Sequence, residues 1–266
     1  MKTRIKKRKG DFNMNFFREI IRGVIVGIGA ITPGVSGGVI ATVFGIYEPI
    51  MNALANFFKD IKTHTRFLMP YALGGVLGFL FFSGVIDFFI THAETQVLFL
   101  FAGIVIGGFP ALIKESNSEG FRYRYLFFSA AAYLLMTASA QIFSHPIGNS
   151  LLKYFVGGSI YSAGSIIPGI SASFILINMG IYKEILSGFM SPVVFIPFLT
   201  GFILTALLLI KGVNFMFKKF HGYAYYTVIG LLSASIVTAM PALSKPLLDI
   251  VILILGILLG FLFINP

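Results

Sequence analysis

The sequence of 266 residues contains no cysteine and no tryptophan, and only 11% of its residues are charged. Without cysteine the chain cannot form disulfide bonds, thiolate metal sites or a cysteine nucleophile. About a quarter of the residues in a soluble globular protein are charged, so this chain has too few to cover a surface that faces water. Because 57% of the residues are apolar and the mean hydropathy is +0.91, the composition predicts an all-α polytopic membrane protein.

The common catalytic patterns are also missing. The four histidines are scattered along the chain without metal-ligand spacing. There is no nucleophile elbow and no Walker-type phosphate loop, and the Gly27-x-Gly29 start of a dinucleotide fingerprint lacks its third glycine and a preceding strand. We therefore expect no enzyme activity, no catalytic residue, no metal site and no cofactor.

The chain begins with a basic segment, residues 1–22. Six of the twenty basic side chains lie in the first ten residues, as at the start of a signal peptide. However, Arg18, Glu19 and Arg22 interrupt the following run, and no small-residue cleavage site appears. We expect an uncleaved cytoplasmic tail that ends in a short interfacial helix over residues 13–22.

Eight stretches beyond the tail lack charged residues. A membrane-spanning helix needs about 20 apolar residues, and six of the stretches fit as spans. The first and the fifth differ because each contains Pro-Gly and small polar residues at its centre. The stretches are 23–47, 67–86, 97–113, 125–143, 154–182, 185–210, 222–244 and 250–266.

The two interrupted stretches are copies of one another. Segment 23–50 aligns with segment 158–185 without a gap, and both copies contain Pro-Gly and, further on, Gly-Ile-Tyr. Beyond them a Pro-x-x-x-Gly pair repeats at 70–74 and 197–201, after a shorter loop in the second copy. We therefore predict one integral membrane domain of two homologous halves, 23–143 and 154–266, each an interrupted segment followed by three spans.

The basic residues indicate how the interrupted segments lie in a membrane. If each is a re-entrant helical hairpin, seventeen of the twenty basic residues fall on one side, but only twelve do so if both segments cross. Cytoplasmic loops carry an excess of Lys and Arg, which favours the hairpins. Three spans per half is an odd number, so the halves form inverted repeats with both termini in the cytoplasm and hairpin tips that meet near the midplane. The net charge of +10 then sets orientation and implies no nucleic acid partner.

The hairpin tips have the residue types of an anion site. Irregular backbone is tolerated in a bilayer only inside protein or along a wet cavity, and proline ends a helix. Glycines permit the reversal, and serines can cap the returning helix, whose first N–H groups carry the positive end of a helix dipole. Alternatively, the small residues only allow close helix packing. The expected substrate-binding residues at the tips are Pro33, Gly34, Ser36, Gly37, Gly38, Pro168, Gly169, Ser171 and Ser173.

Charged residues at the bases of the hairpins could assist. Arg22 and Arg18 could attract an anionic head group at the cytoplasmic leaflet, although juxtamembrane arginines more often anchor the chain at the lipid surface. Glu48 directly follows the first Gly-Ile-Tyr and could gate the site or accept a proton, and Glu184 could do the same in the second copy. We include Arg22 and Glu48 among the expected substrate-binding residues.

Other polar residues near the span ends have simpler interpretations. Tyr47 and Tyr182 end the two Gly-Ile-Tyr motifs and are expected to be interfacial aromatic residues. Asp87 and Asp249 lie near span ends and are expected to be solvated helix caps rather than proton relays.

Three motifs resemble a known family: PGVSGG at 33–38, GIYE at 45–48 and PGISAS at 168–173. They are similar to the bacterial polyprenyl-phosphate (undecaprenyl-phosphate) transporter family PopT, formerly a domain family of unknown function, and the resemblance covers nearly the whole chain. It implies a flippase in the bacterial cytoplasmic membrane that returns undecaprenyl phosphate from the outer to the cytoplasmic leaflet for cell-envelope polymer synthesis. The implied partners are this lipid and membrane lipids. Because inward movement of an anion opposes an inside-negative potential, we also expect a coupling proton or sodium ion.

Two other functions remain open. Membrane phosphatases that act on undecaprenyl pyrophosphate also have Pro-Gly-x-Ser tips, but theirs carry an arginine after the serine where this chain has Gly37 and Ala172. Without that cation, the tip lacks a group to stabilise a transferring phosphoryl group. The second alternative is an exchanger of small ions or anions.

Overall fold

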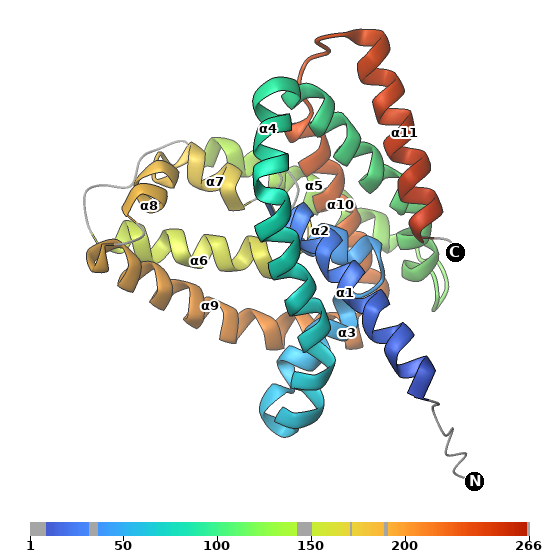
Figure 1. The fold of residues 1–266 in the computed structure, drawn as a ribbon, viewed down its shortest axis with the longest axis vertical. Helices are drawn as coiled ribbons and strands as arrows, with labels where there is room; N and C mark the ends of the chain where they lie inside the picture. The colour runs from blue at the N-terminus through green and yellow to red at the C-terminus, as the bar shows by residue number, and fades with distance from the viewer. Residues whose placement is uncertain (1–8, 32–36, 143–150, 171, 189–190, 265–266) are drawn as a thin grey trace.

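The protein is described by a computed structural model that covers residues 9–31, 37–142, 151–170, 172–188 and 191–264 (Figure 1). These residues form helices and turns and contain no strand, which confirms the all-α prediction. The helices are α1 (Lys9–Ile31), α2 (Gly37–Val43), α3 (Tyr47–Ala55), η1 (Phe57–Lys59), α4 (Ile61–Ser116), α5 (Arg124–Ile142), α6 (Leu152–Ile166), α7 (Ala172–Asn178), α8 (Tyr182–Gly188), α9 (Pro192–Lys219), α10 (His221–Ala239) and α11 (Pro246–Ile264).

Several helices have the length and apolarity of membrane spans. In the described residues, four segments qualify, and a fifth does if the bent pair α2 and α3 forms one span. α11 contains a shorter apolar stretch, Pro246–Leu262. The two remaining predicted spans, 125–143 and 250–266, correspond to α5 and α11. The four qualifying segments are Ile61–Val85, Thr91–Ser116, Pro192–Lys219 and His221–Ala239. The protein is therefore a multi-pass membrane protein.

Three boundaries differ from the predicted ones. The expected interfacial helix over residues 13–22 is the first part of α1, because no helix breaker separates it from the hairpin arm. The expected spans 67–86 and 97–113 both lie in α4, which reverses direction at Ala93 (φ −151°, ψ 42°) without an intervening loop. The span expected at residue 185 begins instead at Pro192, a favoured first residue of a helix.

The helices pack in two kinds of pairs (Figure 1). Within each half, α1 packs along the first part of α4, and α6 packs along α9. Between the halves, α5 packs on α10, and α11 packs on the second part of α4. Each half thus contributes its last helix to the other half, so the two halves form a single body.

The matching positions of the internal repeat make matching contacts. A Cβ atom at Gly23 would meet the carbonyl oxygen of Tyr71, and one at its repeat partner Gly158 would meet that of Phe198. Tyr71 and Phe198 are themselves partners, since each follows the proline of the repeated Pro-x-x-x-Gly pair. In the same way, the glycines that end this pair, at 74 and 201, lie on the carbonyl oxygens of residues 20 and 155. These glycines allow the first arm of each hairpin to touch the following helix backbone to backbone.

This packing gives a stability prediction for α9. Gly201→Ala is expected to lower the free energy of unfolding by about 1–3 kcal/mol, because the new Cβ would overlap the carbonyl oxygen of Phe155. Gly212→Ala is the control: it lies in the same helix with no atom within 4 Å, and its expected effect is neutral or stabilising by up to about 1 kcal/mol. Thermal unfolding of both variants in detergent measures the difference, and equal midpoints would contradict the close contact of α6 with α9.

Candidate functional site

The helix after the first Pro-Gly motif, α2, packs on the helix before it, α1. Pro33, Gly34 and Ser36 lie outside the described residues, and Gly37 and Gly38 begin α2. A Cβ at Gly37 would lie 3.1 Å from the carbonyl oxygen of Val26 and 3.2 Å from the Cβ of Ala30. α2 therefore returns along α1, as a hairpin requires.

The chain then bends sharply at the Gly-Ile-Tyr motif. The axes of α2 and α3 differ in direction by 114°. Gly45 stands at the turn with a φ of +66°, a conformation that favours glycine. The bend leaves α2 as a helix of 7 residues, too short to cross a membrane.

The second tip is described at its proline and glycine. Pro168 is fully buried, and Gly169 has a φ of +91°. A Cβ at Gly169 would lie 2.7 Å from the Cβ of Leu231 and 2.9 Å from the backbone nitrogen of Leu232, both in α10. The hydroxyl of Ser235 donates a hydrogen bond to the carbonyl oxygen of Gly169. Thus α10 holds the second tip in place.

The remaining residues expected at the second tip are less fully placed. Ser171 lies outside the described residues, and Ser173 lies in α7, where its side chain is also outside the described part. Gly164 packs against Ala172, because a Cβ at Gly164 would lie 2.6 Å from that of Ala172. The arms of the second hairpin therefore pack together as the arms of the first do.

The two hairpins contact each other through Tyr47. Its hydroxyl donates a hydrogen bond to the carbonyl oxygen of Ile166, two residues before the second tip. Tyr47 is only 5% exposed, and Val39, Val43 and Ile166 belong to the same apolar cluster. The expectation that Tyr47 is an interfacial aromatic residue is therefore wrong, because the tyrosine joins the first hairpin to the second.

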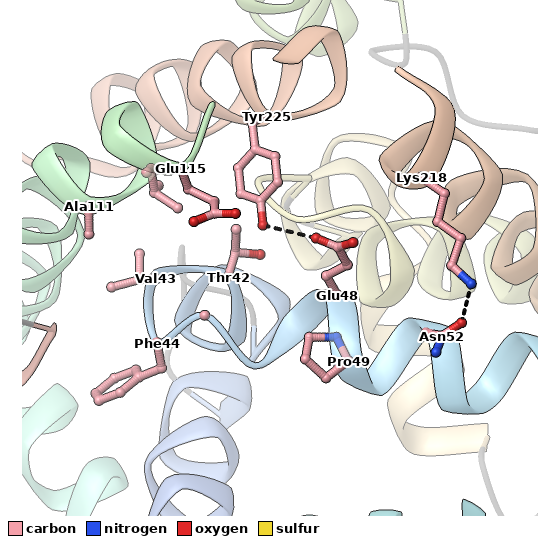
Figure 2. Close-up of a pocket in the computed structure, with 12 residues that line it drawn as sticks. Thr42, Val43, Phe44, Glu48, Pro49, Asn52, Ala111, Glu115, Lys218 and Tyr225 are labelled. Atoms are coloured by element: carbon pink, nitrogen blue, oxygen red, sulfur yellow. Dashed lines mark hydrogen bonds between the residues drawn. The ribbon is translucent and has the colours of Figure 1, made fainter. Parts of the chain in front are cut away.

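A polar pocket of about 610 Å³ lies beside this junction (Figure 2). Glu48 from α3 and Glu115 from the end of α4 both line it, and the hydroxyl of Tyr225 donates a hydrogen bond to Glu48 Oε2 at 3.4 Å. At the other end of the pocket, the amine of Lys218 donates to Asn52 Oδ1. Glu48 therefore lines a pocket near the contact between Tyr47 and Ile166.

His221 connects the two carboxylates of this pocket. Its Nε2 atom lies 3.4 Å from Glu115 Oε1, and its Nδ1 atom lies 4.0 Å from Glu48 Oε2. Its ring centroid is 4.6 Å from that of Tyr225, one turn further along α10. Sequence reasoning missed Glu115, His221 and Tyr225, since only the spacing of four residues between His221 and Tyr225 marks a shared helix face.

Arg22 lies far from the end of α1 that precedes the first Pro-Gly motif. It stands in α1, nine residues before Ile31, so about 14 Å of helix separate the two along the axis. It lies beside Tyr71 of α4, together with Glu19. Arg22 is therefore placed at the base of the first hairpin.

Asp249 has the expected role of a helix cap, but it is not exposed to solvent as expected. It is a cap, because its Oδ2 accepts hydrogen bonds from the backbone N–H groups of Ser244 and Lys245 at 2.7 Å each. It is fully buried rather than solvated, since Gln96 of α4 covers it and donates to Oδ1 at 2.7 Å. The side chain of Asp87 lies outside the described residues. Within the described part of the chain, no group of three or more His, Asp or Glu side chains could hold a metal ion.

The fold and the paired hairpins define a multi-pass helical membrane protein with an internal repeat. Comparison with known families places the chain more narrowly. Residues 26–248 match the undecaprenyl phosphate translocase-like family, and the chain belongs to that family.

Two curated relatives agree with this assignment. A polyprenyl-phosphate transporter of Staphylococcus aureus is 25% identical, over 91% of this chain and 92% of its own length. A polyprenyl-phosphate transporter of Vibrio cholerae is 22% identical, over 86% of this chain and 79% of its own length. No solved structure matches the chain. The expected family is confirmed, and a protein that is not an enzyme fits both relatives.

Proposed function

We propose that the protein is a flippase that moves undecaprenyl phosphate from the outer to the cytoplasmic leaflet of the bacterial cytoplasmic membrane. The observation that carries the proposal is the family match over residues 26–248, which spans both hairpins and the pocket beside them. The names of the two relatives support polyprenyl phosphate as the substrate. In this proposal the lipid returns as a carrier for cell-envelope polymer synthesis.

The phosphate binds at the two hairpin tips in this proposal. Two carbonyl oxygens around the second tip accept hydrogen bonds from side-chain hydroxyls. Tyr47 donates to Ile166, and Ser235 donates to Gly169. Carbonyl oxygens repel an anion, whereas backbone N–H groups and serine hydroxyls attract it. The hydrogen bonds to Ile166 and Gly169 therefore reduce the repulsion that these two carbonyl oxygens would exert on a bound phosphate.

The proposed carrier alternates access between the two membrane faces. Its support is the correspondence between the halves, in which Gly23 and Gly158 make matching contacts with the helix that follows each hairpin. Inverted repeats with broken helices at the midplane are typical of secondary transporters. The two re-entrant hairpins would enter from opposite faces, with both termini in the cytoplasm.

This topology predicts the accessibility of two loops. The chain has no cysteine, so single-cysteine variants can be labelled without background. Ser118→Cys, between α4 and α5, is expected to be protected from a membrane-impermeant maleimide added outside intact cells, and Ala242→Cys, between α10 and α11, to be labelled. Both residues are exposed in the structure. Labelling of both positions from outside would contradict the inverted arrangement.

Coupling to an ion gradient is proposed at Glu48. Inward movement of an anion opposes an inside-negative potential by about 2.3 kcal/mol per charge per 100 mV, and a cation that moves with the anion would offset this cost. The pocket supports this role, because Glu48 and Glu115 lie near the hairpin junction and His221 reaches both. We propose that Glu48 takes up a proton or a sodium ion during each transport cycle.

A test in living cells addresses the proposed function. Deletion of the protein in a strain that lacks redundant carriers is expected to raise undecaprenyl phosphate in the outer leaflet, detected by an antibiotic that binds the phosphate head group. Restoring the chain lowers it again. Unchanged surface levels after deletion would overturn the proposal.

A further inference from the structure

An ion pair lies at the beginning of α6, the end of this helix that is far from the second tip. The amine of Lys153 is 2.5 Å from Glu184 Oε2, and the hydroxyl of Tyr154 donates a hydrogen bond to the same oxygen at 3.3 Å. The amine also lies 5.1 Å from the centroid of the Tyr154 ring. Glu184 of α8 and Tyr154 of α6 thus both lie beside the amine of Lys153.

The two partners are buried to very different extents. The side chain of Lys153 is only 8% exposed, whereas that of Glu184 is 47% exposed. A buried charge needs a partner, but a half-exposed carboxylate returns to water at little cost. Another anion can therefore replace Glu184 and keep Lys153 paired. A phosphate monoester, with a charge of about −1.5 to −2 at neutral pH, is a stronger competitor than a single carboxylate.

The surroundings of Lys153 favour an amphiphilic ligand. Leu151 and Leu152 are 58% and 60% exposed, and Val193 and Ile196 at the start of α9 are 60% and 58% exposed. The start of α6, the start of α9 and α8 lie together at one end of the molecule (Figure 1). A phosphate at Lys153 would therefore have apolar protein surface beside it, along which a polyprenyl chain can lie.

The internal repeat places a second cation at the corresponding position. When the alignment of 23–50 with 158–185 is continued toward the N-terminus, Lys153 corresponds to Arg18, since each stands five residues before the matched glycine, Gly158 or Gly23. Arg18 is exposed near the base of the first hairpin. In inverted repeats these two cations lie on opposite membrane faces, one for each leaflet.

We infer that Lys153, held ready by Glu184, is a docking site for the phosphate of a polyprenyl monophosphate before it reaches the hairpin tips. The inference rests on the proposed function and adds a second position in the transport path. Glu184 occupies the amine until the lipid phosphate displaces it, and no covalent step is involved.

The test compares Lys153→Gln with Glu184→Gln in the full-length protein in nanodiscs, using a short-chain fluorescent polyprenyl monophosphate. Lys153→Gln is expected to weaken binding roughly 10- to 100-fold, because a charge-assisted contact to the phosphate is lost. Glu184→Gln is expected to tighten binding roughly two- to fivefold, because the competing carboxylate is removed. An ion pair that only joined α6 to α8 would instead change binding in the same direction in both variants.

Controls separate this inference from the proposed function. Lys245→Gln, at an exposed lysine in another loop, is expected to bind like the wild type, and thermal unfolding identifies variants that do not fold. If Lys153→Gln does not fold, Glu184→Gln alone decides, since weaker or unchanged binding by it would overturn the inference. Dependence on Lys153 for inorganic phosphate but not for the lipid would also overturn it. If the wild type binds no polyprenyl phosphate, the proposed function itself fails.

Discussion

Gly169→Ala is expected to reduce the transport of polyprenyl phosphate to roughly a hundredth of the wild-type rate, corresponding to about 3 kcal/mol. The backbone of an alanine at this position would be strained, because its φ would be +91°. The added methyl group would also lie 2.7 Å from Leu231 and 2.9 Å from the backbone nitrogen of Leu232, so the tip must move away from α10. That movement breaks the hydrogen bond from Ser235 and displaces the donor groups proposed to hold the phosphate. Leaflet exchange of a labelled polyprenyl monophosphate in proteoliposomes measures the effect.

Gly180 supplies a matched control for this prediction. It also has a left-handed conformation, with a φ of +72°, but a Cβ there would meet no atom within 4 Å. Gly180→Ala therefore introduces the backbone strain, about 1–2 kcal/mol, without the contact with α10. Equal transport by Gly169→Ala and Gly180→Ala would show that the position of the second tip does not limit transport.

Glu48→Gln is expected to lower gradient-driven transport at least tenfold while binding of polyprenyl phosphate stays within about twofold of the wild type. The amide keeps the shape of the side chain but cannot take up a proton and has no negative charge to neutralise a cation. At 100 mV, the loss of one coupled charge removes a driving force of about 2.3 kcal/mol. The measurement is transport into proteoliposomes with an imposed ion gradient and membrane potential, compared with transport without either.

Glu94→Gln is the control for loss of a carboxylate, because Glu94 is exposed near the reversal of α4 and lies away from the pocket residues. It is expected to transport like the wild type under both conditions. If Glu48→Gln responds to the gradients as the wild type does, Glu48 is not the coupling residue.

The sequence predicts the helical class, the spans and the internal repeat, because each depends on local composition or on direct comparison of two segments. Apolar length marks α9 and α10, and Gly23 and Gly158 are recognisable as copies before their contacts are known. Boundaries are less predictable. The polar stretch 87–96 separates the two predicted spans, but no glycine or proline in it marks Ala93 as the point where α4 reverses.

The pocket could be predicted only in part, since its residues come from distant helices. Glu48 follows a repeated motif and is visible in the sequence, whereas His221 and Glu115 are 106 residues apart and meet only in the fold. Burial is equally non-local. Asp249 reads as a solvated cap, but Gln96, 153 residues earlier, covers it.

In the proposed function, this chain moves a lipid phosphate between leaflets without breaking a bond. The most direct test reconstitutes the purified protein in liposomes that carry a fluorescent polyprenyl monophosphate, with the corresponding polyprenyl alcohol and inorganic phosphate in parallel samples. We predict protein-dependent leaflet exchange of the monophosphate, no acceleration for the alcohol or inorganic phosphate, and no release of phosphate. Exchange no faster than in protein-free liposomes, or phosphate released from the lipid, would contradict the proposed function.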